Sequence, residues 1–310
     1  MRTTILIAWS AAFALGGCAP YDRSGDSMTS GTIKAGIDES YSLMIQSQLE
    51  VFKGDYPGAN IVAEYGPEGD IIESLLKDSI QAAVITRGLT EDELAMFRSQ
   101  QKLPESVRIA TDGVALIVNP NNADSVFTLS QVDSLFTGAI TSWSQLGSRQ
   151  SSESVRIVFD HNKSSNARYI NERFLKGLPF PENCFAVHSN EEVIEYVNKN
   201  AGAIGVISVS WISDRDDSAS QEFLSKVRVA GIIDPSNAER PTMARKPYQA
   251  YIYDKSYPLR REVYAIRTSP RTSVGTGFVS FLRGERGQLI IHKMGMVAEQ
   301  TPARIIRISE

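Results

Sequence analysis

Short β-rich runs alternate with segments of helical period along much of this chain. The run GTIKAGI precedes SYSLMIQSQLEVF, NIVAEYG precedes DIIESLLKDS, and AAVITRG precedes TEDELAMFRSQ. Such alternation is typical of βαβ units, in which parallel strands form a sheet and helices cover its faces. The sequence therefore predicts an α/β fold built on mainly parallel sheets.

Several helix ends carry clear signals. Three helices are expected to begin with capping-box spacing, which satisfies free backbone amides in the first turn: Thr90 with Glu93, Thr128 with Gln131 and Ser189 with Glu192. Glycines mark two helix ends, Gly138 after SQVDSLFT and Gly177 after NARYINERFLK.

The chain is expected to change domain near residue 115. Its 310 residues and 42% hydrophobic content allow two domains of ordinary size. The apolar run DGVALIVNP is expected to be a strand, and a new series of strands and helices follows it. Near the end, YQAYIYD and EVYAIRT have the pattern of strands, whereas VGTGFVSFLRGERGQLIIHKMG has that of a helix.

The N-terminus, MRTTILIAWSAAFALGGC, has the pattern of an export signal, with a positive start, an apolar stretch and small residues before a cysteine. The ending LGGC also resembles a bacterial lipobox, in which Cys18 receives lipid; an ordinary secretory signal with an incidental cysteine is the alternative. We expect residues 1–17 to be a lipoprotein signal peptide and residues 18–31 a polar tether. Cys184 then has no partner for an internal disulfide, and a packed or idle thiol is expected there.

Charge and histidine content argue against two function classes. The 32 basic and 36 acidic residues form no long blocks, so we expect no nucleic-acid partner. The three histidines, His161, His188 and His292, are far apart and lack the spacing of metal ligands. No GxSxG elbow is present, and His161 is too close in sequence to Ser164 and Ser165 for a triad. Hydrolysis is disfavoured, and no metal or organic cofactor is indicated.

Small hydrogen-bonding residues concentrate where one predicted strand meets the next helix, in VRIVFDHNKSSNARYINERFL. Ser164, Ser165 and Asn166 lie at this joint, beside the free amides of the helix start, so they could hold an anion with neutral donors. The alternative is that Ser164 or Ser165 merely caps the helix.

Other joints of the same kind occur earlier in the chain. They place Asp38, Glu39 and Ser40 after one strand, Gly69 in the turn YGPEGD, and Thr86 and Arg87 after another strand. Ligands of open α/β sheets bind outside the carboxyl ends of the strands, so several such joints together indicate a binding site. Arg87 could pair with an anion, or with Glu91 or Asp92 in a surface salt bridge, and Arg168 has the same two possibilities.

The stretch LSQVDSLFTGAITSWSQLG combines a leucine-rich helix, Phe-x-Gly and a Trp-containing turn. Three further motifs are NAGAIGVISVSWI, YPLRREVYAI and FVSFLRGERGQLIIHKMGMV. On these motifs the chain resembles the substrate-binding proteins of phosphate ABC transporters, which are PstS-like periplasmic binding proteins, and in particular the lipoprotein forms of Bacteroidetes-type bacteria. The resemblance extends from about Thr32 to Val297, and these motifs are mainly scaffold.

The resemblance implies a two-lobed periplasmic-binding-protein fold of type II, in which two chain crossovers act as a hinge and the ligand lies between the lobes. Lobe I would comprise residues 32–111 plus 254–310, and lobe II residues 112–253. Cys18 would anchor the protein through lipid to a membrane of the cell envelope, facing the periplasm, beside its ABC permease. We expect a monomer.

The ligand residues that the resemblance implies are those at the joints: Asp38, Glu39, Ser40, Gly69, Thr86, Arg87, Ser164, Ser165, Asn166 and Arg168. Asp160 replaces the arginine that the family places four residues before the first serine of its Ser-Gly-Thr motif. Asp38, Glu39, Glu68 and Asp70 add carboxylates near the expected cleft. A carboxylate can select a protonated oxyanion by accepting its proton, although too many would repel the anion. Arg87 and Arg168 are the candidates that would restore the missing charge.

The sequence thus predicts a lipid-anchored solute-binding protein that captures phosphate or a related oxyanion and delivers it to an ABC permease. Two alternatives stay open. One is a non-transport binding or sensor module of the same fold with a different polar ligand, and the other is a secreted phosphoester hydrolase.

Overall fold

The computed structural model describes residues 26–147, 153–213 and 218–300. The expected signal peptide, Cys18 and most of the expected tether lie outside these residues. Within the described ranges, every helix is too short or too polar to span a lipid bilayer.

Ten strands form one sheet in the described part of the chain. Eight of them lie in the order β2 (Ala59–Gly66), β1 (Gly31–Asp38), β3 (Ala82–Ile85), β12 (Arg260–Arg267), β4 (Glu105–Val118), β8 (Ala203–Ser208), β6 (Arg156–Phe159) and β7 (Cys184–Ala186). The short strands β13 (Val297–Ala298) and β9 (Arg228–Val229) also pair with β4. A separate small sheet contains β11 (Ala244–Arg245), β10 (Gly231–Ile233) and β5 (Val126–Thr128).

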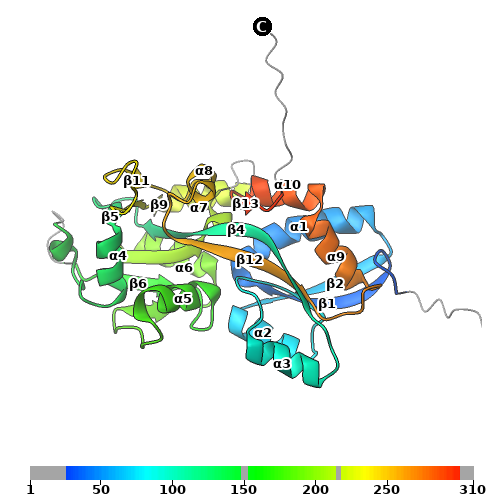
Figure 1. The fold of residues 1–310 in the computed structure, drawn as a ribbon. Coiled ribbons are helices and arrows are strands. Elements are labelled where there is room, and N and C mark those ends of the chain that lie inside the picture. The colour runs from blue at the N-terminus through cyan, green and yellow to red at the C-terminus, as the bar shows by residue number, and fades with distance from the viewer. Residues whose placement is uncertain (1–25, 148–152, 214–217, 301–310) are drawn as a thin grey trace, which may run out of the picture.

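The paired strands β4 and β12 run side by side between the two halves of the molecule (Figure 1). Residues 105–113 of β4 pair with β12, with an irregularity at Ile109, and its last five residues, 114–118, pair with β8. On either side of this crossing the strands are parallel, β1 with β2 and β3 in one half and β6 with β7 and β8 in the other. The α/β, two-lobed fold expected from the sequence is confirmed.

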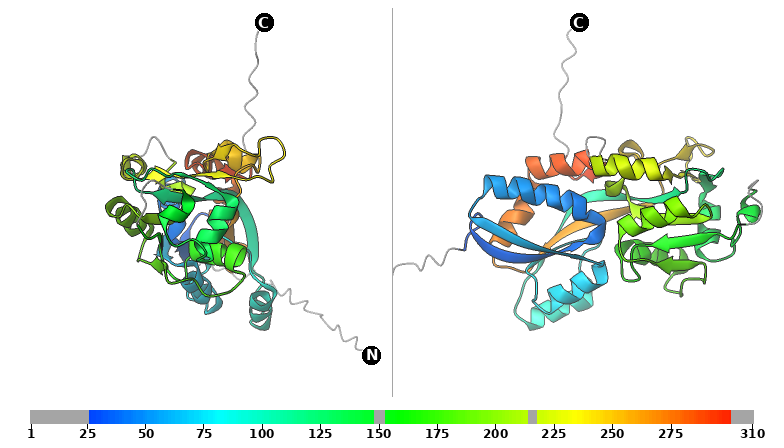
Figure 2. Two further views of the ribbon diagram at one scale, coloured as in Figure 1. Left: turned by 90° about the vertical axis from the view of Figure 1, so that its left-hand side faces the viewer. Right: turned by 180° about the vertical axis from the view of Figure 1, so that it is seen from behind.

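Helices cover both faces of the sheet. In the first half, α1 (Ser42–Asp55) and α9 (Val274–Arg283) lie on one face, and α2 (Glu68–Leu76) and α3 (Glu91–Ser99) on the other (Figures 1 and 2). The remaining α-helices are α4 (Leu129–Phe136), α5 (Ser165–Ile170), α6 (Asn190–Lys199), α7 (Ser218–Lys226), α8 (Gln249–Tyr253) and α10 (Glu285–Lys293). Three short 3-10 turns also lie in the described ranges: η1 (Glu39–Tyr41) after β1, η2 (Trp143–Leu146) after α4 and η4 (Val209–Trp211) after β8. A π-helical segment, η3 (Asn171–Leu175), continues α5.

Most of the local signals are confirmed. Both parts of the capping box are present at Thr90 and at Thr128. Ser189 caps α6, but the Glu192 carboxylate accepts a hydrogen bond from His188 N rather than from Ser189 N. Gly138 and Gly177 have left-handed φ values of 79° and 87°, which suits glycine because it has no Cβ to clash.

Two expectations about the C-terminal region are wrong. YQAYIYD forms the short helix α8 instead of a strand. The segment expected as one helix is divided at Gly284, whose extended backbone ends α9 and begins α10.

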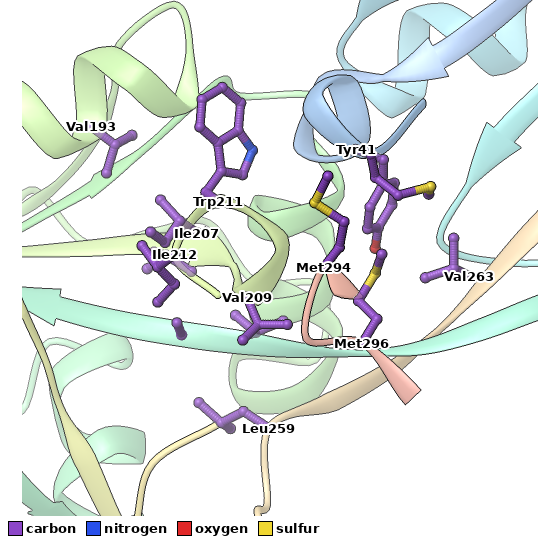
Figure 3. Close-up of a cluster of buried hydrophobic side chains, with 14 of the residues drawn as sticks. Tyr41, Val193, Ile207, Val209, Trp211, Ile212, Leu259, Val263, Met294 and Met296 are labelled. Atoms are coloured by element: carbon purple, nitrogen blue, oxygen red, sulfur yellow. The ribbon is translucent and has the colours of Figure 1, made fainter. Parts of the chain in front are cut away.

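The core is continuous across the two halves. Figure 3 shows Tyr41 of η1 beside Met294 and Met296, with Trp211 of η4 in the same cluster. Burying a large apolar side chain stabilises the fold by about 1.5–3 kcal/mol. This cluster therefore fixes η1 and η4 next to each other, at the place where the polar residues described below converge.

Candidate functional site

A buried polar network lies where strand ends from both halves meet the crossing strands. Its members are almost inaccessible to solvent: Asp38, Ser40, Glu68, Thr86, Asp112, Asp160, Ser164, Ser165, Asn166, Asn190, Ser208, Ser210 and Arg261. β1 ends at Asp38, β6 ends just before Asp160, and β8 ends at Ser208. Carboxyl ends of parallel strands are where α/β folds bind ligands, as the sequence led us to expect.

Ser40 joins the two halves. Its hydroxyl lies 3.3 Å from Ser165 Oγ and accepts a hydrogen bond from Asn166 Nδ2 at 3.3 Å. Its carbonyl oxygen accepts from Ser210 Oγ at 2.8 Å and from Trp211 Nε1 at 3.0 Å. The predicted residues Ser40, Ser165 and Asn166 are therefore brought together.

Arg261 is the buried cation of the network, with a side chain that is 3% exposed. Its Nε donates to Asp112 Oδ2 and its Nη1 to Ser165 Oγ, both at 3.0 Å. Asp112 also accepts from Tyr41 OH at 3.0 Å and from Ser208 Oγ at 2.9 Å. Burial opposes the charge of Arg261, but the hydroxyl of Tyr41 and the carboxyl groups of Asp112 and Asp38 raise its pKa above the ordinary value.

Burial also shifts the acids of the network toward their neutral forms. It raises the pKa of Asp38 to about 7, helped by the charge of Glu68, and the pKa of Glu39 to about 7. It likewise raises the pKa of Asp112 and of Asp160. Asp38 Oδ1 accepts from Ser40 N at 2.9 Å, and a carboxylate oxygen of Glu39 accepts from Asn190. A ligand at this network thus meets carboxyl groups that are poised to exchange protons near neutral pH.

Arg168 ties the two halves together through Glu68 and Thr86. Its Nε donates to Glu68 Oε2 at 2.5 Å, and its Nη2 to Thr86 Oγ1 at 2.6 Å. Thr86 N and Oγ1 donate to Glu68 Oε1 at 2.6 and 2.7 Å. Burial would raise the pKa of Glu68, but Arg168 and Thr86 outweigh it and hold that pKa below the ordinary value. The charge of Arg168 is therefore already neutralised.

Two sequence-predicted residues have other partners. Arg87 forms a salt bridge with Glu93 at 2.6 Å, and its guanidinium also donates to Gly88 O, outside the buried network. The partner is Glu93, rather than Glu91 or Asp92. Gly69 N donates to Lys163 O at 3.0 Å, a backbone bond between the halves, and Lys163 Nζ lies 2.7 Å from Asp70.

At the joint after β6, the capping alternative is confirmed for Ser164. Ser164 caps α5, because its Oγ accepts from Ala167 N at 3.2 Å. Ser165 and Asn166 face the network instead.

Three buried atoms of the network have no hydrogen-bond partner among the described residues: Asp38 Oδ2, Asn166 Oδ1 and Arg261 Nη2. Buried polar atoms in folded proteins are nearly always hydrogen-bonded, so unpartnered ones that share a network indicate a ligand. Asn166 Oδ1 is an acceptor and Arg261 Nη2 a charged donor, whereas the Asp38 carboxyl accepts when it is ionised and can donate when it is protonated.

Sequence reasoning missed Arg261, Asp112 and Asn190. Arg261 stood inside a stretch interpreted as scaffold, and Asp112 opened the predicted strand DGVALIVNP, although it lies in the interior of β4. A charged residue within an otherwise apolar strand was the signal that could have identified Asp112, because a buried charge requires a partner.

Acidic residues are numerous in the network, but no cluster of three or more His, Cys, Asp or Glu side chains within the described ranges has the arrangement of a metal site.

The family model described as the PBP superfamily domain matches residues 23–286. Among curated proteins, the phosphate-binding protein PstS of Staphylococcus saprophyticus is 20% identical over 280 residues, which cover 89% of this chain and 82% of that protein. The phosphate-binding protein PstS of Bacillus subtilis is 21% identical over 235 residues, covering 75% and 72%. A solved structure of a putative phosphate ABC transporter substrate-binding protein with bound phosphate, from Clostridium perfringens, has a TM-score of 0.71 and 22% identity, and the match covers 87% of this chain and 100% of that one. This structural likeness establishes the fold.

Proposed function

The chain belongs to the PBP superfamily, and from that membership we propose that it captures phosphate, or a related oxyanion, between its lobes for delivery to an ABC permease. The two curated relatives, which are matched over 82% and 72% of their lengths, are named phosphate-binding proteins. Their names support a role in binding rather than in catalysis. We further propose that lobe I comprises residues 32–111 plus 254–310 and lobe II residues 112–253; within β4 this boundary lies two residues before the strand exchanges β12 for β8.

Arg261 is the observation that carries the proposal. It is a fully buried cation in a network that joins both halves, and its Nη2 has no partner among the described residues. An arginine can present such a donor to an oxyanion, and a hydrogen bond with a charged partner contributes about 1.5–3 kcal/mol. Arg261 Nη2 can thus present to the ligand the charged donor that Asp160 cannot.

The hydrogen bonds available in the network can supply most of the free energy that tight anion binding requires. Micromolar affinity requires about 8 kcal/mol. Arg261 and the hydroxyls of Ser40 and Ser165 can donate to the ligand, while Asp38 and Asn166 can accept from its hydroxyl groups. One charged bond and four or so neutral bonds of about 1 kcal/mol each approach that value before the cost of lobe closure.

The other predicted residues take different roles in this proposal. Arg168, Thr86 and Gly69 hold the lobes closed, through Glu68 and Lys163. Glu39 fixes Asn190, and Ser164 caps α5. Arg87 lies outside the site.

The cellular setting that we propose follows from the N-terminal sequence and the family. Lipidated Cys18 anchors the protein, as a monomer, on the periplasmic side of the cell envelope beside the permease. Metabolic labelling with a radioactive fatty acid, compared between the natural chain and Cys18→Ser, tests the anchor.

Isothermal titration calorimetry with inorganic phosphate tests the binding function. The chain should start at Ala19, which retains every described residue, and should be unfolded and refolded to remove retained ligand. We expect one-to-one binding at micromolar or lower concentration. Arg261→Gln should weaken it by about tenfold to a hundredfold, the loss expected for one charged hydrogen bond.

Arg260 provides the matched control, because it precedes Arg261 on the same strand and is partly exposed. Arg260→Gln should bind like the natural chain. Arg261→Lys keeps the charge beside Asp112 and guards against misfolding of the glutamine variant. Absence of saturable binding by the natural chain, checked by thermal shift at millimolar phosphate, would refute the proposal.

A further inference from the structure

A groove of about 600 Å3 lies where α7, β9 and the start of α8 meet the end of α10. Both α7 and α10 lie along the same edge of the molecule (Figures 1 and 2). The residues that line this groove are all different from those of the buried polar network. Gln249 joins its two sides, because its Nε2 donates to His292 O at 3.1 Å and to Met296 O at 2.5 Å. A cavity of this size is in the range of small-molecule sites, about 300–1,000 Å3.

Within the described ranges, four basic side chains and no carboxylate line this groove, which we call the basic groove: Arg228, Lys246, His292 and Lys293. The whole chain, in contrast, has a formal net charge of −4. None of the four forms a salt bridge with a residue that the structure describes. His292 and Lys293 lie in the last turn of α10, where cations interact favourably with the helix dipole, but this role does not account for Arg228 or Lys246.

Arg228 is held in place without a counter-charge. Its Nη1 donates to Asn122 O at 3.0 Å and its Nη2 to Pro120 O at 2.7 Å, and both of these acceptors are neutral carbonyl oxygens. A guanidinium has five N–H donors and stays charged at physiological pH. Its charge and some of its donors are therefore available to an anion, with which an arginine forms stronger hydrogen bonds than with a neutral acceptor.

The buried part of the basic groove is apolar. Val209, Ile212 and Val227 line it and are at most 5% exposed. Leu224 beside them is half-buried, and Tyr248, which also lines the groove, is 54% exposed. Covering this surface with an apolar group removes it from water, which favours binding. The basic groove thus combines cations without counter-charges and an apolar surface.

We propose that the basic groove is a second binding site, which takes a small organic anion with an apolar body. The negative group lies among Arg228, Lys246 and Lys293, and the apolar body covers Leu224 and Tyr248. An inorganic anion alone would leave the apolar surface in water, whereas a neutral apolar molecule would leave the cations without a counter-charge. Because the groove shares no residue with the buried polar network, its ligand does not compete with phosphate there.

Fluorescence titration with two dyes tests this site. Anilinonaphthalene sulfonate carries a negative group on an aromatic body, and phenylnaphthylamine has the same rings without the charge. Both become brighter in apolar surroundings. The chain starting at Ala19 is titrated in the presence of inorganic phosphate, which under the proposed function occupies the buried polar network. We expect one saturable site for the sulfonate dye, with an affinity at least about fivefold higher than that of the neutral dye and falling as salt is added.

Lysine variants locate the sulfonate dye. Lys246→Gln and Lys293→Gln should each weaken its binding about twofold to fivefold, and the double variant about tenfold, because each removes one partly screened charge. Binding of the neutral dye should not change. The matched control is Lys176→Gln/Lys199→Gln, which removes the same charge from exposed positions outside the groove and should bind both dyes like the natural chain. Thermal unfolding of each variant checks that it is folded.

Tyr248→Ala tests the apolar part of the site and should weaken the binding of both dyes. Unchanged affinity of both dyes in this variant would place them elsewhere and overturn the inference. Equal affinity of the natural chain for the two dyes would also overturn it, because the cations would then take no part. So would equal weakening in the control double variant, because the effect would then come from net charge alone. The inference does not depend on the proposed function, since absence of phosphate binding would leave these expectations unchanged.

Discussion

Under the proposed function, the contacts of Arg168 with Glu68 and Thr86 hold the lobes closed, so replacing Arg168 by methionine should weaken ligand binding. Arg168 lies on α5 in one half, and its partners Glu68 and Thr86 lie in the other. Glu68 is 1% exposed, so in Arg168→Met its carboxylate would be buried without a cation. Two bonds from Thr86 would remain, at 2.6 and 2.7 Å.

The size of the effect follows from the burial of this pair. Removing one partner of a buried ion pair costs about 3–5 kcal/mol, and the remaining Thr86 bonds place this case at the lower end. About 3 kcal/mol corresponds to roughly a hundredfold loss of affinity. Under the proposed function, opening of the lobes separates Arg168 from Glu68, so we expect the penalty in the closed state and not in the folding of either lobe.

Stopped-flow kinetics and calorimetry with phosphate measure this loss. Because the contact forms on closure, we expect faster dissociation with little change in association. The double variant Arg168→Met/Glu68→Gln should recover most of the affinity, since no unpaired charge remains. Glu172→Gln is the control: it removes the exposed i,i+4 partner of Arg168, a contact worth about 0.3–0.5 kcal/mol. Unchanged affinity in Arg168→Met would refute the closure role of this residue.

Three further predictions follow from other parts of the structure. Arg87→Ala should leave phosphate affinity within about twofold in calorimetry, because its guanidinium is held by Glu93, and a tenfold loss would return Arg87 to the site. Burial raises the pKa of Asp38 from 3.8 to about 7, so the ligand-free protein should lose stability as the pH rises between these values, and Asp38→Asn should remove that loss in thermal unfolding; parallel curves would contradict it. Gly113→Ala would place its Cβ 2.7 Å from Ile252 Cδ1 and should destabilise by about 1–3 kcal/mol in urea unfolding, whereas Gly54→Ala, in α1 with nothing within 4 Å, should stabilise by about 0.5–1 kcal/mol; equal effects would refute the crowding argument.

The sequence predicted well those features that depend on neighbouring residues. Capping at Thr90 and Thr128 involves residues three positions apart, and the alternation of strand and helix is likewise local. The helix α8 shows where this reasoning ends. Its tyrosines and Ile252 favour a strand by propensity, but the segment is short and Ile252 packs against Gly113 of β4, so tertiary contacts decide its conformation.

In the candidate site too, local sequence signals identified some residues, whereas contacts between distant residues were missed. Asp38, Ser40, Ser165 and Asn166 could be placed near one another from the sequence because each lies at or shortly after a strand end, and the carboxyl ends of parallel strands converge. Arg261 and Asp112 were not, because 149 positions separate them and their contact depends on how β4 and β12 align. The register of that antiparallel pair places Arg261 directly opposite Asp112. No local pattern specifies such a register.

Because of this register, the cation of the site lies on a different segment from the one that the family resemblance implied. The resemblance placed the cation on the segment after β6, where this chain has Asp160. Here the free guanidinium nitrogen belongs to β12, one of the two strands that cross between the lobes, and it is held there by Asp112 of the other. Ser40 and Ser165, which come from opposite halves, meet beside it. Under the proposed function, a cation on the crossing strands stays close to both halves when they open. The anion would therefore be held first at the hinge, and the hydroxyls of the two lobes would reach it on closure.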